Sequence, residues 1–238
     1  MVNKYKSVLL KISGESLLGN LQFGIDYNPV EMITSEIKSI YDRGVQVAVV
    51  VGGGNIFRGV KNSAQLGMDQ ASGDYVGMLA TVMNAVVLQC ALKKIEVECR
   101  VMTAIAMNQI AEPYYRHKAV RHLEKGRVVI FAAGTGNPFF TTDTASALRA
   151  SEIGADVMLM AKNGVDGVYT DDPKTNPKAQ KLEKISYADI IKKDLKIMDT
   201  SACALCKQNG IPIIVFDFKA QGSLVKIMNG DSVGTYIS

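Results

Sequence analysis

The sequence predicts an α/β protein in which helices cover both faces of a mainly parallel sheet. Short apolar runs typical of buried strands alternate along the chain with segments that carry helix signals, an order found in parallel sheets. Runs such as VQVAVVV and RVVIFAA have almost no polar alternation, which indicates that both faces of those strands are covered. No internal repeat or low-complexity linker interrupts this order, so we expect one domain over residues 1–238.

The expected strands follow from these apolar runs. They are Lys6–Ile12, Val45–Val51, Val97–Met102, Val128–Ala132, Val157–Met160 and Ile211–Phe216. The polar stretch TDDPKTNPKAQKLE, residues 170–183, holds two prolines and is expected to form an excursion or a short hairpin.

The first expected helix has clear signals at both ends. Asn28 is the predicted N-cap, Pro29 suits the first helical position, and Glu31 completes a capping box. The helix should end near Gly44, because glycine readily adopts the left-handed cap. Three further helices are expected over residues 73–94, between Pro113 and Lys125, and over Thr142–Glu152.

Composition excludes some classes of protein. The 27 basic and 23 acidic residues nearly balance, at a net charge of +4, and no block of like charge appears. A nucleic-acid backbone is therefore not the expected main partner. A phosphorylated small molecule needs only two or three well-placed cations, which this chain can supply.

No segment predicts export or membrane insertion. Lys6 and Lys11 flank only three consecutive apolar residues, which cannot form the core of a signal peptide. The longest apolar segment, Met78–Leu92, is interrupted by polar residues and falls short of the ~20 apolar residues that cross a bilayer. We therefore expect a cytoplasmic protein without a membrane partner.

The cysteines are expected to be buried structural thiols. Cys203 and Cys206 form a C-x-x-C motif, but no second such motif follows, and zinc prefers four ligands. His117 and His122 are five residues apart and so would not share a helix face. Free cysteines are among the most buried residues, and we expect this of Cys90, Cys99, Cys203 and Cys206.

Three strands end in glycine-rich turns, and in such sheets ligands bind beyond the carboxyl ends of the strands. The turns are KISGE (11–15), GGGNIFRG (52–59) and GTGNPFFTTD (134–143). Consecutive glycines let backbone N–H groups approach an anion, and Arg58 could add a bidentate contact. Lys11 lies next to Ser13 and Gly14, and this combination of a cation with a Ser-Gly turn resembles a phosphate-binding loop. Taken singly, each could be an ordinary turn, but three at one edge favour an anion site.

Phosphoryl transfer also needs an acidic group to orient lysines or hold Mg²⁺. The candidates are Asp143, Asp166, Asp172 and Asp199. Asp143 and Asp199 each precede or open an expected helix, where a carboxylate also suits the helix dipole.

Together these motifs carry a family resemblance. KISGE, GGGNIFRG, GTGNPFFTTDTA, VDGVYTDDP and IMDTSA resemble the amino-acid kinase family and, within it, the branch whose members phosphorylate UMP. They span residues 11–202 in the family's order. The resemblance implies a three-layer α/β/α sandwich with the amino-acid kinase fold. It also implies transfer of the ATP γ-phosphoryl group to UMP, giving UDP for pyrimidine nucleotide biosynthesis.

The resemblance also implies roles for particular residues. The catalytic residues would be Lys11, Asp143 and Asp199. ATP would bind to Lys11, Ile12, Ser13, Gly14, Gly54, Arg58, Asn163, Tyr169 and Asp172. UMP would bind to Gly53, Asp74, Thr135, Gly136, Asn137, Pro138, Phe139, Phe140, Thr141 and Thr142. The N-terminal part would form mainly the acceptor site, and the part from about residue 155 mainly the ATP site. Mg²⁺ would be held mainly by ATP and water, without protein ligands.

Two segments bear on the finer roles. The loop Met160–Gly164 is one residue longer than a threonine-containing form in some members, which weakens the assignment of Asn163 and of any role for Lys162. Gly19–Asp26 resembles a segment linked to activation by GTP in some members. GTP as activator and UTP as inhibitor are therefore candidate regulators, and the family's usual homohexamer is the expected assembly.

Two alternatives remain at this point. One is another member of the family, acting on carbamate, glutamate or aspartate. The other is a non-catalytic nucleotide or oxyanion binder on the same fold. The motif GTGNPFFTTD favours a nucleotide acceptor, and the presence of Lys11, Asp143 and Asp199 favours an enzyme.

Overall fold

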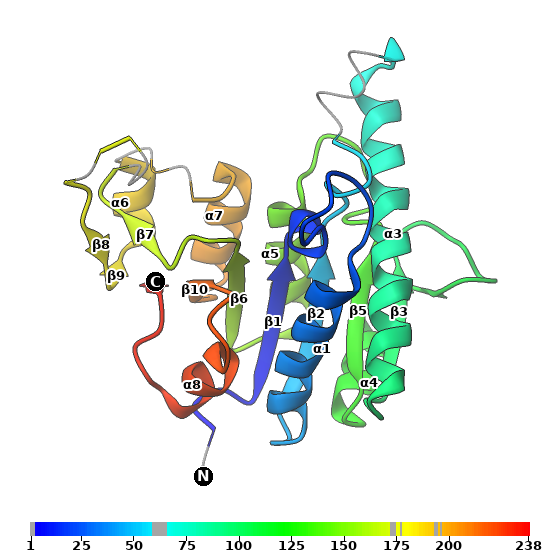
Figure 1. The fold of residues 1–238 in the computed structure, drawn as a ribbon, viewed down its shortest axis with the longest axis horizontal. Coiled ribbons are helices and arrows are strands. Elements are labelled where there is room, and N and C mark those ends of the chain that lie inside the picture. The colour runs from blue at the N-terminus through cyan, green and yellow to red at the C-terminus, as the bar shows by residue number, and fades with distance from the viewer. Residues whose placement is uncertain (1–2, 59–65, 172–174, 177, 193–194, 196) are drawn as a thin grey trace.

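A nine-stranded sheet runs through the protein in the order β4-β3-β5-β2-β1-β6-β10-β11-β9 (Figure 1). The computed structural model describes residues 3–58, 66–171, 175–176, 178–192, 195 and 197–238. Neighbouring strands are parallel in every pairing except β10 with β11. The predicted mainly parallel sheet is confirmed.

The strands of this sheet are short. They are β1 (Ser7–Ile12), β2 (Gln46–Val51), β3 (Cys99–Thr103), β4 (Glu112–Pro113), β5 (Val128–Ala132), β6 (Val157–Lys162), β9 (Lys184–Ile185), β10 (Ile213–Asp217) and β11 (Thr235–Ile237). The six expected strands are confirmed within two residues at either end. The others hold two or three residues, too few for a hydrophobic period to show.

A short hairpin is confirmed at the expected excursion over residues 170–183, of which residues 172–174 and 177 lie outside the described part of the chain. Its strands β7 (Val168–Tyr169) and β8 (Lys181–Leu182) pair antiparallel outside the main sheet. Figure 1 shows this hairpin beside β9, at the end of the sheet far from β3.

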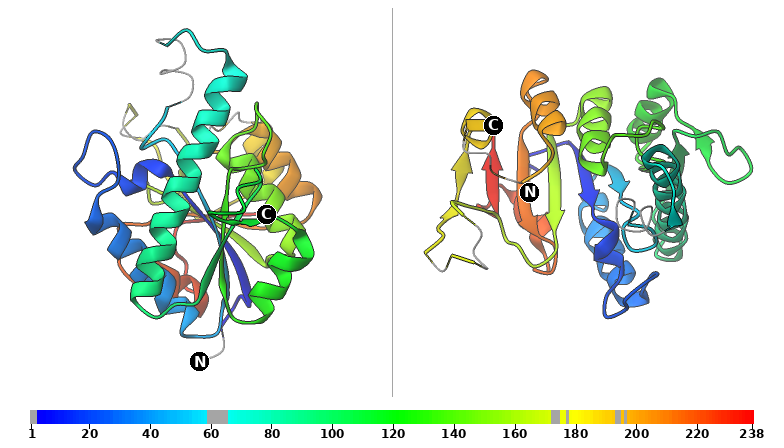
Figure 2. Two further views of the ribbon diagram at one scale, coloured as in Figure 1. Left: turned by 90° about the vertical axis from the view of Figure 1, so that its right-hand side faces the viewer. Right: turned by 90° about the horizontal axis from the view of Figure 1, so that it is seen from above.

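Helices cover both faces of the sheet and complete the three predicted layers (Figure 2). One face packs against α1 (Tyr27–Tyr41), α3 (Gln70–Lys94) and α8 (Ser223–Asn229). The other face packs against α4 (Arg116–Glu124), α5 (Thr142–Ile153), α6 (Tyr187–Lys192) and α7 (Thr200–Gln208). A single 3₁₀ turn, η1 (Gly14–Leu17), follows β1.

Alternation along β1 decides where Lys11 points. Val8, Leu10 and Ile12 belong to the core under α1 and α3, whereas Leu9 belongs to the core under α5 and α7. Successive side chains of a strand point to opposite faces, so Lys11 lies on the α5 side. Because β1 is flanked by β2 and β6 at the middle of the sheet, Lys11 stands between its two halves.

The start of α1 differs from the prediction. The helix begins at Tyr27, and the N-cap is Asp26, whose carboxylate accepts the N–H of Asn28 at 3.1 Å. The predicted cap at Asn28 is therefore wrong. Pro29 occupies the third helical position, which is also tolerated because the first four N–H groups of a helix have no intrahelical acceptor.

Three of the four cysteines are buried, as predicted, and Cys90 is exposed, which contradicts the prediction for that residue. Burial raises the pKa of the Cys99 thiol to about 11 and that of Cys206 to about 12. Burial also raises the pKa of Cys203. Within the described ranges no three His, Cys, Asp or Glu side chains gather as a metal site would require.

Helix α3 extends further than expected, over 25 residues. It is the one helix of the described part whose length and apolar composition would suffice to span a membrane, and 44% of its most apolar window is buried inside the protein. Its inner face includes Ala85, Leu88 and Leu92, which are fully buried against the sheet. Such packing is typical of a core helix.

Candidate active site

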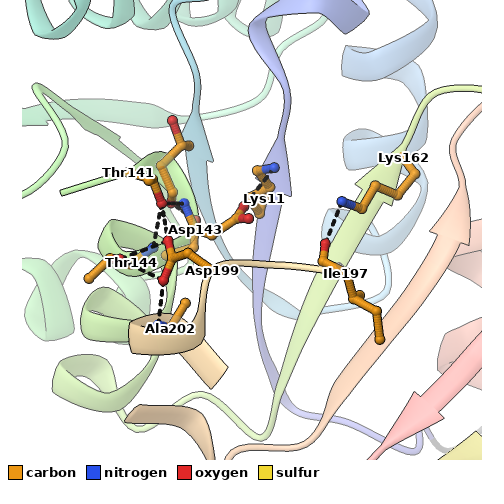
Figure 3. A network of polar contacts seen from close by, with 10 residues as sticks. Lys11, Thr141, Asp143, Thr144, Lys162, Ile197, Asp199 and Ala202 are labelled. Carbon is orange, nitrogen blue, oxygen red and sulfur yellow. Dashed lines mark hydrogen bonds and ion pairs between the residues drawn. The ribbon is translucent and has the colours of Figure 1, made fainter. Parts of the chain in front are cut away.

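An ion pair between Lys11 and Asp143 lies at the centre of the carboxyl edge of the sheet (Figure 3). Lys11 Nζ is 2.8 Å from Asp143 Oδ1, and the two side chains are only 10% and 17% exposed. Lys11 comes from β1, and Asp143 from the first turn of α5. In the described part of the chain Asp143 is the only partner of this ammonium. Two of its three N–H groups therefore remain for a ligand.

Two glycine turns meet beside this pair. A Cβ atom on Gly14 would lie 2.6 Å from the N of Gly54 and 2.8 Å from the O of Gly52, so no side chain fits there. Among the described residues, the N–H groups of Gly14, Gly53 and Gly54 meet no protein acceptor. Free backbone N–H groups next to a lysine form a concave donor surface that suits an anion.

A cavity of about 230 Å³ opens next to the glycine turns. Predicted UMP-site residues among its lining are Gly53, Asp74, Thr135, Asn137, Phe140, Thr141 and Thr142, and the predicted ATP-site residue Gly54 also lines it. Gly136, Pro138 and Phe139 lie in the same loop but outside the lining. Gly77, Met78 and Thr81 of α3 line the cavity as well. They were not predicted, because in the sequence they belong to an apolar helix without a motif.

Asp74 holds the loop that closes one side of the cavity. Its Oδ2 accepts the N–H of Phe139 at 2.8 Å. Phe139 has a φ of 70°, an unusual conformation for a residue with a side chain. The second carboxylate oxygen, Oδ1, meets no protein donor within the described ranges, and Asp74 is one of the residues that line the cavity.

Asp199 connects the N-termini of two helices (Figure 3). It caps α7, where its Oδ1 accepts the N–H of Ala202 at 2.6 Å. Its carboxylate also accepts the hydroxyl of Thr144 at 2.9 Å and that of Thr141, which is the N-cap of α5. The structure thus gives Asp199 helix-cap partners, and its predicted catalytic role stays a prediction.

The residues predicted for ATP phosphates lie around the first turn. Ser13 precedes η1 but its hydroxyl makes no capping bond, so the hydroxyl can serve a ligand. Arg58 is exposed, with Nη2 3.0 Å from Glu15 Oε1 and Nε donating to the O of Gly54 at 3.4 Å. Ile12 is fully buried, so only its backbone could contact ATP.

The residues predicted for the ATP nucleoside lie beyond β6. Asn163 follows that strand and is exposed, and Tyr169 belongs to β7. The hydroxyl of Tyr169 donates to Asp166 Oδ1 at 2.7 Å, and this bond raises the pKa of Tyr169. Asp172 lies outside the described residues. These roles stay predictions.

Lys162, at the end of β6, is a second cation near the site and is half-buried. Its Nζ donates to the O of Ile197 at 2.7 Å (Figure 3). Burial lowers its pKa, the Lys11 ammonium lowers it further, and the Asp143 carboxylate partly offsets both. Two lysines and one aspartate therefore share one electrostatic environment where β1 and β6 end.

Comparison with known proteins assigns the chain and its fold to a family. The family model described as "Amino acid kinase family" matches residues 6–217. The chain belongs to the amino acid kinase family. The earlier resemblance is thus confirmed for nearly the whole chain.

Solved structures of this family are similar over their full length. The chain is 42% identical to a UMP kinase from Bacillus anthracis, with a TM-score of 0.96 over 98% of this chain and 96% of that one. It is 36% identical to a UMP kinase from Ureaplasma parvum, with a TM-score of 0.93 over 99% of both chains. It is 30% identical to a uridylate kinase from Archaeoglobus fulgidus, with a TM-score of 0.74 over 97% of this chain and 99% of that one.

Proposed function

We propose that this amino acid kinase is a UMP kinase, which transfers the γ-phosphoryl group of ATP to UMP and yields UDP and ADP. The observation that carries the proposal is the cavity next to the glycine turns, which is lined in part by the loop over residues 134–142. The similarity to three UMP or uridylate kinases over nearly whole chains supports the same acceptor.

Lys11 is the residue that would stabilise the transferring group. Phosphoryl transfer requires positioning and neutralisation of charge, and no nucleophilic side chain. The Lys11 ammonium is held by Asp143, and its free N–H groups can follow the phosphoryl oxygens from donor to acceptor. The N–H groups of Gly14, Gly53 and Gly54 would bind the remaining phosphate oxygens.

The acceptor nucleoside would lie in the 230 Å³ cavity. Uracil has one N–H donor and two carbonyl acceptors, which the side chains of Asn137 and Thr135 and the nearby backbone can match. Asp74 Oδ1 would accept hydrogen bonds from the ribose hydroxyls. UMP would then be held at both ends, with its phosphate toward Lys11.

Mg²⁺ would arrive as part of the MgATP substrate. The oxygens of Asp199 already accept hydrogen bonds from two hydroxyls and one N–H group, and Asp143 is paired with Lys11. Among the described residues, no three His, Cys, Asp or Glu side chains gather into a metal site, so the proposal gives Mg²⁺ no resident site on the protein. Mg²⁺ commonly keeps water and phosphate oxygens as ligands.

We further propose a cytoplasmic enzyme of pyrimidine nucleotide biosynthesis that assembles as a homohexamer and responds to GTP and UTP. In support of self-association, Tyr75, Leu79 and Met83 of α3 are exposed by 45%, 48% and 56%. They are spaced by four residues and so form one apolar stripe. Light scattering measures the assembly, and initial rates with added GTP or UTP measure the regulation.

A coupled assay of ADP release tests the proposed reaction. With MgATP, we expect turnover with UMP and none with carbamate, glutamate or aspartate. The rate with CMP relative to that with UMP measures the selectivity for uracil over cytosine. Direct detection of UDP excludes ATP hydrolysis as the source of ADP. Turnover with another acceptor, or ATP binding without turnover, would refute the proposal.

A further inference from the structure

Helix α3 has a polar side chain buried deep in its inner face, Asn84, which is fully buried. Buried amides require partners for every N–H group, because an unmet donor is costly away from water. Asn84 lies ten residues beyond Asp74 and outside the cavity lining. The proposed reaction therefore gives it no direct contact with a substrate.

Asn84 forms a reciprocal pair with Asn55 of the GGGN turn. Asn84 Nδ2 donates to Asn55 Oδ1 at 2.7 Å, and Asn55 Nδ2 donates to Asn84 Oδ1 at 3.0 Å. The second N–H group of Asn84 donates to the O of Gly52 at 2.7 Å, and that of Asn55 to the O of Gly24 at 3.0 Å. All four N–H groups are satisfied. The amide orientations are therefore fixed by the carbonyl partners.

The pair holds both ends of the glycine turn. Gly52 and Asn55 bracket Gly53 and Gly54, whose N–H groups would bind phosphate oxygens. Between these anchors, a Cβ atom on Gly53 would lie 2.6 Å from the O of Gly77 in α3. The turn is therefore pressed against α3 by close packing and tied to it by hydrogen bonds at each side.

The same pair reaches the first phosphate turn and the Gly19–Asp26 segment. A Cβ atom on Gly14 would lie 2.7 Å from Asn55 Oδ1, so the Asn55 amide packs directly against Gly14. Gly24 also donates its N–H to the O of Asn55 at 3.0 Å. Moving the amide pair would consequently shift Gly14, Gly54 and Gly24 together.

We propose that Asn84 is a positioning residue for phosphoryl transfer, which through its amide pair with Asn55 holds the N–H groups of the glycine turn at the phosphates. This inference takes the identity of the substrate from the proposed function, whereas the hydrogen bonds on which it is based come from the structure alone. The pair requires a side chain of this length that carries two N–H donors and one carbonyl acceptor, and asparagine is the only residue that has both.

The test replaces the donors of Asn84 while keeping its shape. In Asn84→Asp, a carboxylate oxygen replaces the nitrogen that now donates to the O of Gly52 and to Asn55 Oδ1, both at 2.7 Å. The resulting repulsion between oxygen atoms should displace the glycine turn. We expect kcat with UMP to fall roughly 10²-fold, since a displacement of about 1 Å in a catalytic site can have this effect. We also expect the Kd for MgATP, measured by calorimetry, to rise at least about tenfold.

Glu36→Gln is the matched control. Glu36 is also buried and accepts the N–H groups of Gly222 and Leu224 at 2.6 and 3.3 Å, at the start of α8 and away from the glycine turn. Both variants should unfold at lower urea concentration, but only Asn84→Asp should lose kcat when both are assayed folded. Equal kcat and equal MgATP affinity in the two variants would overturn the proposal.

Two further measurements complete the test. Asn84→Ser keeps one donor, so it should fold more readily and lose less kcat, and a wild-type kcat in this folded variant would also overturn the proposal. The MgATP affinity separates this inference from the proposed acceptor. If the wild type fails to phosphorylate UMP yet Asn84→Asp weakens MgATP binding, the acceptor is wrong and the positioning role holds.

Discussion

Replacing Lys11 by methionine removes the charge at the centre of the site while keeping an unbranched side chain of similar length. An ion pair at the observed 2.8 Å has a gross attraction of about 6 kcal/mol at an effective dielectric of about 20. Desolvation of the two charges offsets much of this attraction. Loss of Lys11 leaves the largely buried Asp143 unpaired, and we expect the free energy of unfolding to fall by about 3 kcal/mol.

The catalytic effect of Lys11→Met should be separable from this loss of stability. Removing one preorganised electrostatic group from an active site commonly lowers kcat by about 10²–10³-fold, equivalent to about 3–4 kcal/mol. The double variant Lys11→Met with Asp143→Asn removes the orphaned charge. It should recover stability to near the wild-type value without recovering kcat.

Urea unfolding and the coupled ADP assay, run on the same samples, measure both quantities. A kcat within threefold of wild type in folded Lys11→Met would refute the catalytic role of the ammonium. Recovery of kcat in the double variant would show instead that the unpaired carboxylate, and not the missing cation, had blocked the reaction. An unchanged unfolding free energy in Lys11→Met would contradict the buried character of the pair.

Three further predictions concern the surroundings of the site. Asp74→Ala should raise the KM for UMP at least about tenfold and the KM for ATP far less, because a hydrogen bond from a hydroxyl to a carboxylate contributes about 1.5–3 kcal/mol. Initial-rate kinetics measure both constants, and an equal rise in the two would contradict a contact between Asp74 and the ribose of UMP. Asp199→Ala should lower the free energy of unfolding by roughly 2 kcal/mol through loss of the α7 cap and its bond to Thr144, as measured in urea, and unchanged stability would contradict that link. Because the pKa of Cys206 is raised to about 12 by burial, the unfolded chain alone loses this proton above about pH 9, so stability falls as the pH rises. Between pH 7 and 10, the free energy of unfolding in urea should therefore fall by about 1.4 kcal/mol less in Cys206→Ala than in the wild type. An equal fall in both proteins would contradict the raised pKa.

The sequence predicted the elements whose signals are local. The long apolar runs became strands, and the turns after β1, β2 and β5 lie together because parallel strands end at one edge. The cap of α1 was misplaced because Asp26 and Asn28 carry equivalent signals two residues apart, and only the fold selects between them.

The remaining features depend on tertiary contacts. The side-chain pair of Asn55 and Asn84 joins positions 29 residues apart, and neither residue carries a motif that names the other. Likewise, Asp199 resembles an active-site acid in the sequence. In the structure, its carboxylate accepts hydrogen bonds from the hydroxyls of Thr141 and Thr144 and from an N–H group of α7. Only the folded chain shows which polar groups are already satisfied.

The uneven burial of the thiols provides a natural labelling site. Cys99, Cys203 and Cys206 are enclosed, whereas Cys90 is exposed on α3, seven residues beyond Met83 and so on the same side of that helix. A maleimide should therefore modify the native protein at a single position, without removal of the other cysteines. Because the label would stand beside the apolar stripe of α3, its rate of attachment would report directly whether another molecule covers that face.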